Sequence, residues 1–69
     1  MTNTELLLAA IKKSGYKRSY IAEQIGRTPY CLALKINNVS EFTTREVDAL
    51  CKLLSIDTLE EKERIFFAK

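Results

Sequence analysis

The stretch IAEQIGRTPYCLALKI, residues 21–36, breaks off one helical pattern and begins another within a few residues. Apolar residues recur at helical spacing as far as Ile25, Gly26 interrupts them, and Thr28 followed by Pro29 opens a second apolar segment. Glycine readily takes the positive φ angle of a tight turn after a helix. Threonine is a favoured N-cap, and proline suits the first helical position, where its missing N–H would have no partner. The stretch therefore predicts two short helices joined by a tight turn.

Local signals on both sides of this stretch predict three further helices. The spacing of a capping box occurs at Thr2 and Glu5 and at Thr43 and Glu46. It also occurs at Asp57 and Glu60, where Asp57 is the expected cap. No alternation of apolar and polar residues is long enough to favour a strand. We therefore predict an all-α fold and a single domain over residues 1–69. Its five helices are expected over about 3–14, 18–25, 28–36 and 43–54, and from 58 onward.

Composition and cysteine usage favour a globular cytoplasmic protein. Of the 69 residues, 46% are hydrophobic and 29% are charged, which is usual for a soluble domain. No apolar run approaches the roughly 18 residues that a membrane span needs, and no basic segment precedes the first apolar residues as in a signal peptide. Cys31 and Cys51 lack the spacing of a disulfide framework or a zinc site, so both are expected to be reduced core or boundary residues.

The chain lacks histidine and the motifs that are typical of enzyme sites. There is no histidine, no glycine-rich phosphate loop and no group of residues with metal-ligand spacing. We therefore expect no catalytic residue, no cofactor, no metal and no small-molecule substrate.

The charges are distributed unevenly along the chain. Residues 1–38 hold six basic and two acidic residues, whereas residues 39–69 hold five basic and seven acidic ones. The basic half contains the interrupted helix, and this asymmetry favours a polyanionic partner on that side. Lys12 and Lys13 are expected to lie on a solvated helix face, and Tyr16 and Tyr20 in the core or at its boundary.

The segment KRSYIAEQIGRTPYCLALKINNVSEFTTREVDALCKLLSI, residues 17–56, resembles the helix-turn-helix core of Cro- and repressor-type (XRE-like) phage regulators. Together with TELL and IKKSGYK before it and IFFAK after it, the chain is similar to small Cro-like prophage regulators of Gram-positive bacteria. The resemblance implies a compact five-helix repressor-like domain with a helix-turn-helix in its second and third helices. It also implies a sequence-specific regulator that occupies an operator in double-stranded DNA, with residues 28–36 in the major groove.

The resemblance also implies which residues face DNA. The positions that address base edges are Thr28, Pro29, Tyr30, Ala33 and Leu34. Phosphate contacts are expected from positions around the two helices and from cations beside them, namely Lys17, Arg18, Ser19, Arg27, Lys35, Asn37, Asn38 and Ser40.

The expected recognition helix departs from the family in being apolar at its centre. Bidentate hydrogen bonds to bases need Arg, Lys, Asn or Gln, and none stands on its central exposed turn. Direct readout would then depend on Thr28, the Tyr30 hydroxyl and apolar contacts to thymine methyl groups, with DNA shape contributing more. Tyr30 is equally well interpreted as a half-buried aromatic residue. The apolar face also favours an alternative, in which the same fold is a protein-interaction module or antirepressor that contacts another regulator.

The run IFFAK near the end of the chain predicts an exposed aromatic residue. Ile65, Phe66 and Phe67 are consecutive, so one helix face cannot bury all three. The last helix could pack between the first and fourth helices with both aromatic rings partly covered. Alternatively, the three residues could form the contact of a homodimer on DNA, since related regulators bind two half-sites about one turn apart.

Overall fold

The computed structural model describes residues 1–68 and contains five helices and no strand within them. The helices are α1 (Thr4–Ser14), α2 (Arg18–Gln24), α3 (Pro29–Ile36), α4 (Thr44–Leu53) and α5 (Leu59–Phe66). The prediction of an all-α fold is therefore confirmed, and each helix lies within one or two residues of its expected position.

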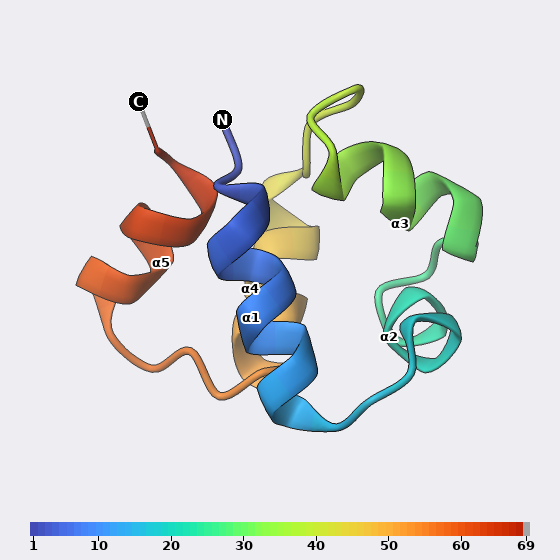
Figure 1. Cartoon of the computed structure of the whole chain (residues 1–69), viewed down its shortest axis with the longest axis horizontal. Coiled ribbons are helices and arrows are strands. Elements are labelled where there is room, and N and C mark those ends of the chain that lie inside the picture. Colours follow the sequence, from blue (N-terminus) through green and yellow to red (C-terminus); the bar gives the residue numbers. More distant parts are fainter. Residues whose placement is uncertain (69) are drawn as a thin grey trace.

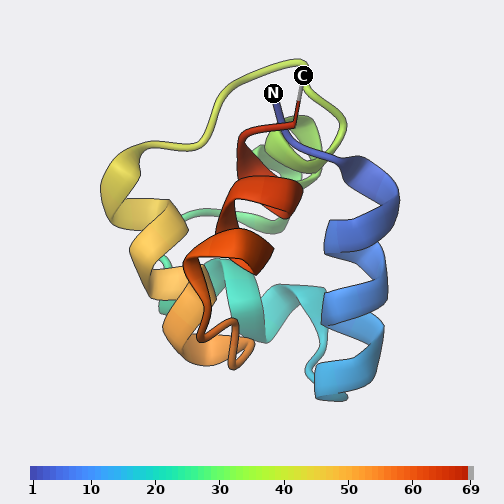
Figure 2. The same ribbon diagram turned by 90° about the vertical axis from the view of Figure 1, so that its left-hand side faces the viewer.

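The helices surround one core. Figure 1 shows α2 and α3 together on one side of the molecule and α5 on the opposite side. In the view turned by 90° (Figure 2), α5 lies in front, with α1 on one flank and α4 on the other. The prediction that the last helix packs between the first and fourth agrees with this arrangement. The longest extent of the molecule, 27 Å, separates the α2–α3 side from the α5 side.

Most of the expected helix boundaries are confirmed by their capping contacts. Thr43 and Glu46 form a complete capping box, and the Thr28 hydroxyl accepts a hydrogen bond from the N–H of Cys31. Gly15 and Gly26 have φ angles of 77° and 75°, so they occupy the left-handed conformation that ends α1 and turns the chain after α2. These signals are local, which is why they could be recognised without the tertiary structure.

Two predicted caps are wrong by one residue. Asn3, and not Thr2, caps α1, since its side chain accepts from the N–H of Leu6. Thr2 is instead buried against the loop after α3. Thr58, and not Asp57, caps α5. At α1, the chain enters the helix from a position fixed by the contact of Thr2 with Asn38, far away in the sequence.

One residue from each helix is enough to outline the core. Leu7, Ile21, Leu32 and Leu50 are almost completely buried, and Phe66 of α5 lies edge-on to the ring of Phe42 with centroids 5.7 Å apart. The full buried apolar set comprises Leu7, Ile11, Ile21, Ala22, Leu32, Ile36, Val47, Leu50, Leu54, Ile56, Ile65 and Phe66.

The turn between α4 and α5 contains a strained residue. Ser55 has a φ angle of 57° and is exposed, so a side chain occupies a conformation that favours glycine. We expect Ser55→Gly to raise the free energy of unfolding by about 0.5 kcal/mol, because the removed strain exceeds the extra freedom of glycine in the unfolded chain. Urea denaturation measures the change.

A second turn supplies the control for this substitution. Gly26 has a similar φ angle, and a Cβ added there meets no atom within 4 Å. Gly26→Ala should therefore lower stability by about 1 kcal/mol through backbone strain alone. A loss of stability in Ser55→Gly would show that the left-handed conformation of Ser55 is not strained.

Candidate functional site

The pairing of α2 and α3 forms the best-defined surface feature. The two helices contact each other, and Ala22 of α2 and Leu32 of α3 are buried between them and the rest of the core. The turn is closed by a 2.8 Å hydrogen bond from the N–H of Arg27 to the carbonyl of Ala22. This bond and the left-handed Gly26 fix the angle at which α3 leaves α2.

The first turn of α3 is the most exposed part of the helix. Tyr30 is 72% exposed, so it is not the half-buried aromatic residue of the alternative interpretation. Thr28 and Pro29 are exposed as well, whereas Ala33 and Leu34 are half-buried. The five residues expected to address bases therefore divide into three that project into solvent and two that lie at the edge of the core.

Three of the residues expected to contact phosphate are accessible at the start of α2. Lys17, Arg18 and Ser19 are all exposed, and none of them forms an ion pair within the described residues 1–68. At the other end of α3, Ser40 is half-buried, while Asn37 is exposed and donates its side-chain amide to the carbonyl of Ala33 at 3.0 Å.

Asn38 has a structural role that the sequence did not reveal. Its φ angle of 64° places it in the left-handed region, where Asn is tolerated better than most residues. Its side-chain amide accepts from the N–H of Thr2 at 2.9 Å and donates to the Thr2 carbonyl at 2.8 Å. The amide expected to contact DNA thus joins the first residues of the chain to the loop after α3.

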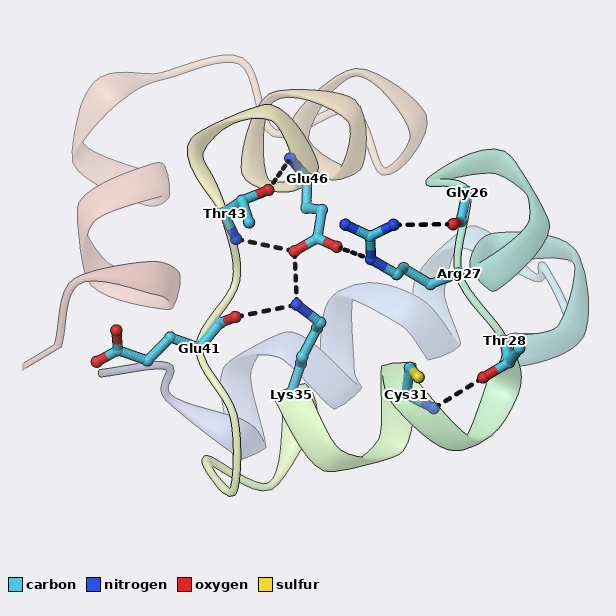
Figure 3. A network of polar contacts seen from close by, with 8 residues as sticks. All are labelled: Gly26, Arg27, Thr28, Cys31, Lys35, Glu41, Thr43 and Glu46. Atoms are coloured by element: carbon cyan, nitrogen blue, oxygen red, sulfur yellow. Dashed lines mark hydrogen bonds and ion pairs between the residues drawn. The ribbon is translucent and has the colours of Figure 1, made fainter.

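Two of the expected phosphate-binding cations are held by a buried carboxylate. Glu46 is 3% exposed, and its Oε1 lies 2.8 Å from Lys35 Nζ and accepts from the N–H of Thr43 at 2.8 Å. Its Oε2 lies 2.6 Å from Arg27 Nε, although no well-directed hydrogen bond reaches this oxygen. Lys35 also donates to the carbonyl of Glu41 (Figure 3). We call this group the Glu46 cluster, comprising Glu46, Arg27, Lys35 and Thr43.

The Glu46 cluster keeps its carboxylate charged. Burial by itself raises the pKa of Glu46, but the hydrogen bonds from Lys35 and Thr43 and the charges of Lys35 and Arg27 outweigh it, so the pKa is lowered overall. The Lys35 side chain is only 12% exposed, whereas that of Arg27 is 44% exposed and its attraction is screened by water. Lys35 is therefore the stronger partner, and the cluster ties the α2–α3 turn and α3 to the start of α4.

The expected dimer residues differ in accessibility. Ile65 and Phe66 are 5% and 4% exposed, whereas Phe67 is 57% exposed. The prediction of an exposed aromatic residue in IFFAK is confirmed, and Phe67 is the one of the three that is accessible at the surface.

Tyr16 and Tyr20 are each 42% exposed, which places them at the surface rather than in the core. Cys31 and Cys51 are free thiols at the core boundary, and burial raises the pKa of the Cys51 thiol. None of the helices in residues 1–68 combines the length and the hydrophobicity that crossing a bilayer requires.

Comparisons with protein-family models, curated proteins and solved structures gave no match. The family resemblance of the sequence therefore stays a prediction.

Proposed function

We propose that the chain is a double-stranded DNA-binding transcriptional regulator of the Cro or repressor type, from a prophage or mobile element. In this proposal α2 and α3 act as a helix-turn-helix, with α3 in the major groove and α2 across the backbone. The observation that carries it is the exposed first turn of α3, held at a fixed angle to α2 by the Gly26 turn. Family members address bases from this part of the recognition helix.

The charge around α3 supports the same docking. Residues 29–36 contain no acidic side chain, so no carboxylate of α3 would repel the phosphates that line the groove. Because the Glu46 cluster engages Arg27 and Lys35, the phosphate contacts fall mainly to Lys17, Arg18 and Ser19. Backbone contacts of this kind position a protein on DNA without reading its sequence.

Sequence readout would come from few polar groups. The Tyr30 hydroxyl and the Thr28 side chain lie on the exposed turn, and Asn37 follows at the far end of α3. We infer that thymine methyl contacts and DNA shape supply part of the specificity. A homodimer on DNA, with Phe67 in its contact, would add a second half-site about one turn away.

Two substitutions separate positioning from readout. Arg18→Ala is expected to weaken binding to every duplex and to lower the salt dependence of log K by about 0.9, the effect of one phosphate contact. Tyr30→Ala should change the preferred sequence more than the non-specific affinity. Fluorescence anisotropy with labelled duplexes over a range of salt concentrations measures both effects.

Arg64→Ala is the matched control for these substitutions, since Arg64 is an exposed cation on α5, on the side opposite α3. Unchanged duplex binding in both Arg18→Ala and Tyr30→Ala would contradict the proposed docking. Selection of duplexes from a random library at near-physiological salt provides the operator. An inverted repeat indicates a dimer on DNA, and a single short site indicates a monomer.

A protein-interaction module or antirepressor is the second candidate function. It is favoured by Tyr30 and Val39, each 72% exposed, which flank the half-buried Leu34 on the outer side of α3 and its following loop. An apolar surface of this kind would bind another regulator with little dependence on salt, whereas binding to DNA weakens steeply as salt is raised.

A further inference from the structure

A basic surface with exposed aromatic residues adjoins the start of α2, and it shares Lys17 and Arg18 with the proposed contacts to duplex phosphates. It covers the end of α1, the connection to α2 and the first turns of α2. We call it the tyrosine–lysine patch, comprising Lys12, Lys13, Tyr16, Lys17, Arg18 and Tyr20. All six residues are exposed.

The two tyrosines of the patch form an exposed aromatic pair. The ring centroids of Tyr16 and Tyr20 lie 5.0 Å apart, and the rings are tilted by 39°. Each residue keeps 42% of its surface exposed. An aromatic pair left at the surface offers ring faces on which another flat ring can stack.

The cations of the patch are free to attract an anion. Within residues 1–68, none of Lys12, Lys13, Lys17 and Arg18 forms an ion pair, in contrast to Arg27 and Lys35. No acidic residue occurs in the sequence between Glu5 and Glu23, so the whole patch is built from a segment without carboxylates. Four unpaired cations within residues 12–18 therefore create a local positive potential.

Two recesses bring three of the cations next to Tyr16. Lys12, Tyr16 and Arg18 line one recess of about 460 Å³, whose apolar wall is formed by Leu8 and Ile11. Lys13 and Tyr16 also line a second recess of about 430 Å³ between α1 and α5. Glu61 and Arg64 line this second recess as well, and their opposite charges offset each other. Tyr16 thus stands between two hollows, each with a lysine at its edge.

We propose that the tyrosine–lysine patch binds single-stranded nucleic acid. The four cations would hold the phosphates, and unpaired bases would stack on Tyr16 and Tyr20. Alternating cations and exposed aromatic rings are the combination by which proteins bind single strands with little sequence preference. In a duplex the bases are stacked on each other and not available to the rings. The patch therefore differs from the α3 surface in the form of nucleic acid that it takes, and it does not depend on α3 binding DNA.

Labelled oligo(dT) and oligo(rU) of about 12 nucleotides, within the usual range of site sizes, are the probes. Anisotropy at low salt is expected to show binding of at least one of them. The double variant Tyr16→Leu with Tyr20→Leu should bind about tenfold or more weakly, since stacking of each base contributes at this level. Tyr16→Phe with Tyr20→Phe keeps the aromatic faces and should retain the affinity. A preference between the two probes identifies whether DNA or RNA is the better ligand.

Two further readouts test the parts of the patch separately. Lys12→Ala with Lys13→Ala should lower the salt dependence of log K by about 1.4, the value for two contacts to a single strand. The chain has three tyrosines and no tryptophan, so in Tyr30→Phe protein the tyrosine emission comes from Tyr16 and Tyr20 alone. Bound oligo(dT) should quench this emission.

Tyr30→Leu is the matched control, because Tyr30 is an exposed tyrosine outside the patch. It should leave single-strand binding unchanged. Circular dichroism and thermal melting establish that each variant is folded. The proposal is overturned if neither oligonucleotide binds, or if the leucine variant binds as tightly as the unmodified protein. It is also overturned if the phenylalanine variant loses as much affinity as the leucine variant. Lys17 and Arg18 also serve the proposed duplex docking, so the variants that test the patch change only Lys12, Lys13, Tyr16 and Tyr20. Duplex binding is measured with separate probes, so either function can fail alone.

Discussion

Glu46→Gln is expected to lower the free energy of unfolding by about 3 kcal/mol, near the lower end of the range for breaking a buried ion pair. Glutamine keeps the size of the side chain and can still accept from the N–H of Thr43, so the capping box is preserved. What is lost is the negative charge beside Lys35, whose side chain is 12% exposed. The accessible Arg27 can turn to water, which moderates the effect.

The effect of Glu46→Gln should depend on pH. The pKa of Glu46 in the folded protein lies below its ordinary value of 4.5. A carboxylate with a depressed pKa stabilises the fold fully above its unfolded pKa, and this contribution is lost as the pH falls through the folded pKa. The difference in stability between the unmodified protein and Glu46→Gln should therefore be largest near neutral pH and should shrink below pH 4.5.

Urea denaturation at neutral and acidic pH measures this difference. Asp48→Asn is the control, since Asp48 pairs with Lys62 at 3.1 Å but its side chain is 55% exposed. Surface pairs of this kind contribute about 0–1 kcal/mol. Equal effects of the two substitutions at neutral pH would mean that the Glu46 cluster is no stronger than a surface ion pair.

Leu50→Ala is expected to destabilise the protein by about 3 kcal/mol, through lost apolar burial and the cavity left behind. Leu50 is completely buried on α4, in the core shared with α1, α2 and α3. For a domain of this size, such a loss lowers the melting temperature by roughly 12–24 °C. A domain this small has limited stability to lose, so the variant should be partly unfolded at physiological temperature. Thermal melting followed by circular dichroism measures the shift.

Leu59→Ala provides the comparison, because Leu59 is a leucine on α5 that is 67% exposed. Surface substitutions usually change stability by less than about 0.5 kcal/mol. A loss in Leu59→Ala as large as that in Leu50→Ala would indicate that the exposed leucine is covered, for example by a second copy of the chain.

The parts of the fold that depend on neighbouring residues could be predicted from the sequence. Gly26, Thr28 and the Thr43–Glu46 pair act within one turn of the chain, and their signals were sufficient to place α2, α3 and α4. The start of α1 was misplaced because Thr2 is positioned by Asn38, far away in the sequence. A local pattern carries no information about such a contact.

The candidate site was predictable in outline and not in its electrostatics. The exposed position of Thr28 follows from the helical pattern and the family resemblance, whereas the sequence left open whether Tyr30 is exposed or half-buried. The ion pairs of Glu46 with Arg27 and Lys35 join three separate segments, and the local sequence does not reveal which cations take part. One signal was present, since Glu46 precedes Leu50 by one helical turn and so lies on the buried face of α4. A carboxylate at such a position needs a cationic partner.

The contacts of the first residues make the two halves of the chain depend on each other. The N–H of Asn3 donates to the carbonyl of Ile65 at 2.6 Å, and Thr2 is bound to Asn38. The hydrogen bond between Asn3 and Ile65 thus brings the two ends of the segment from Asn3 to Ile65 together at α5. Local opening at Thr2 and Asn3 would break contacts with α5 and with the loop after α3. We therefore expect its free energy to approach that of unfolding a large part of the domain. As a result, we expect the whole domain to unfold cooperatively, even though each helix is only two or three turns long.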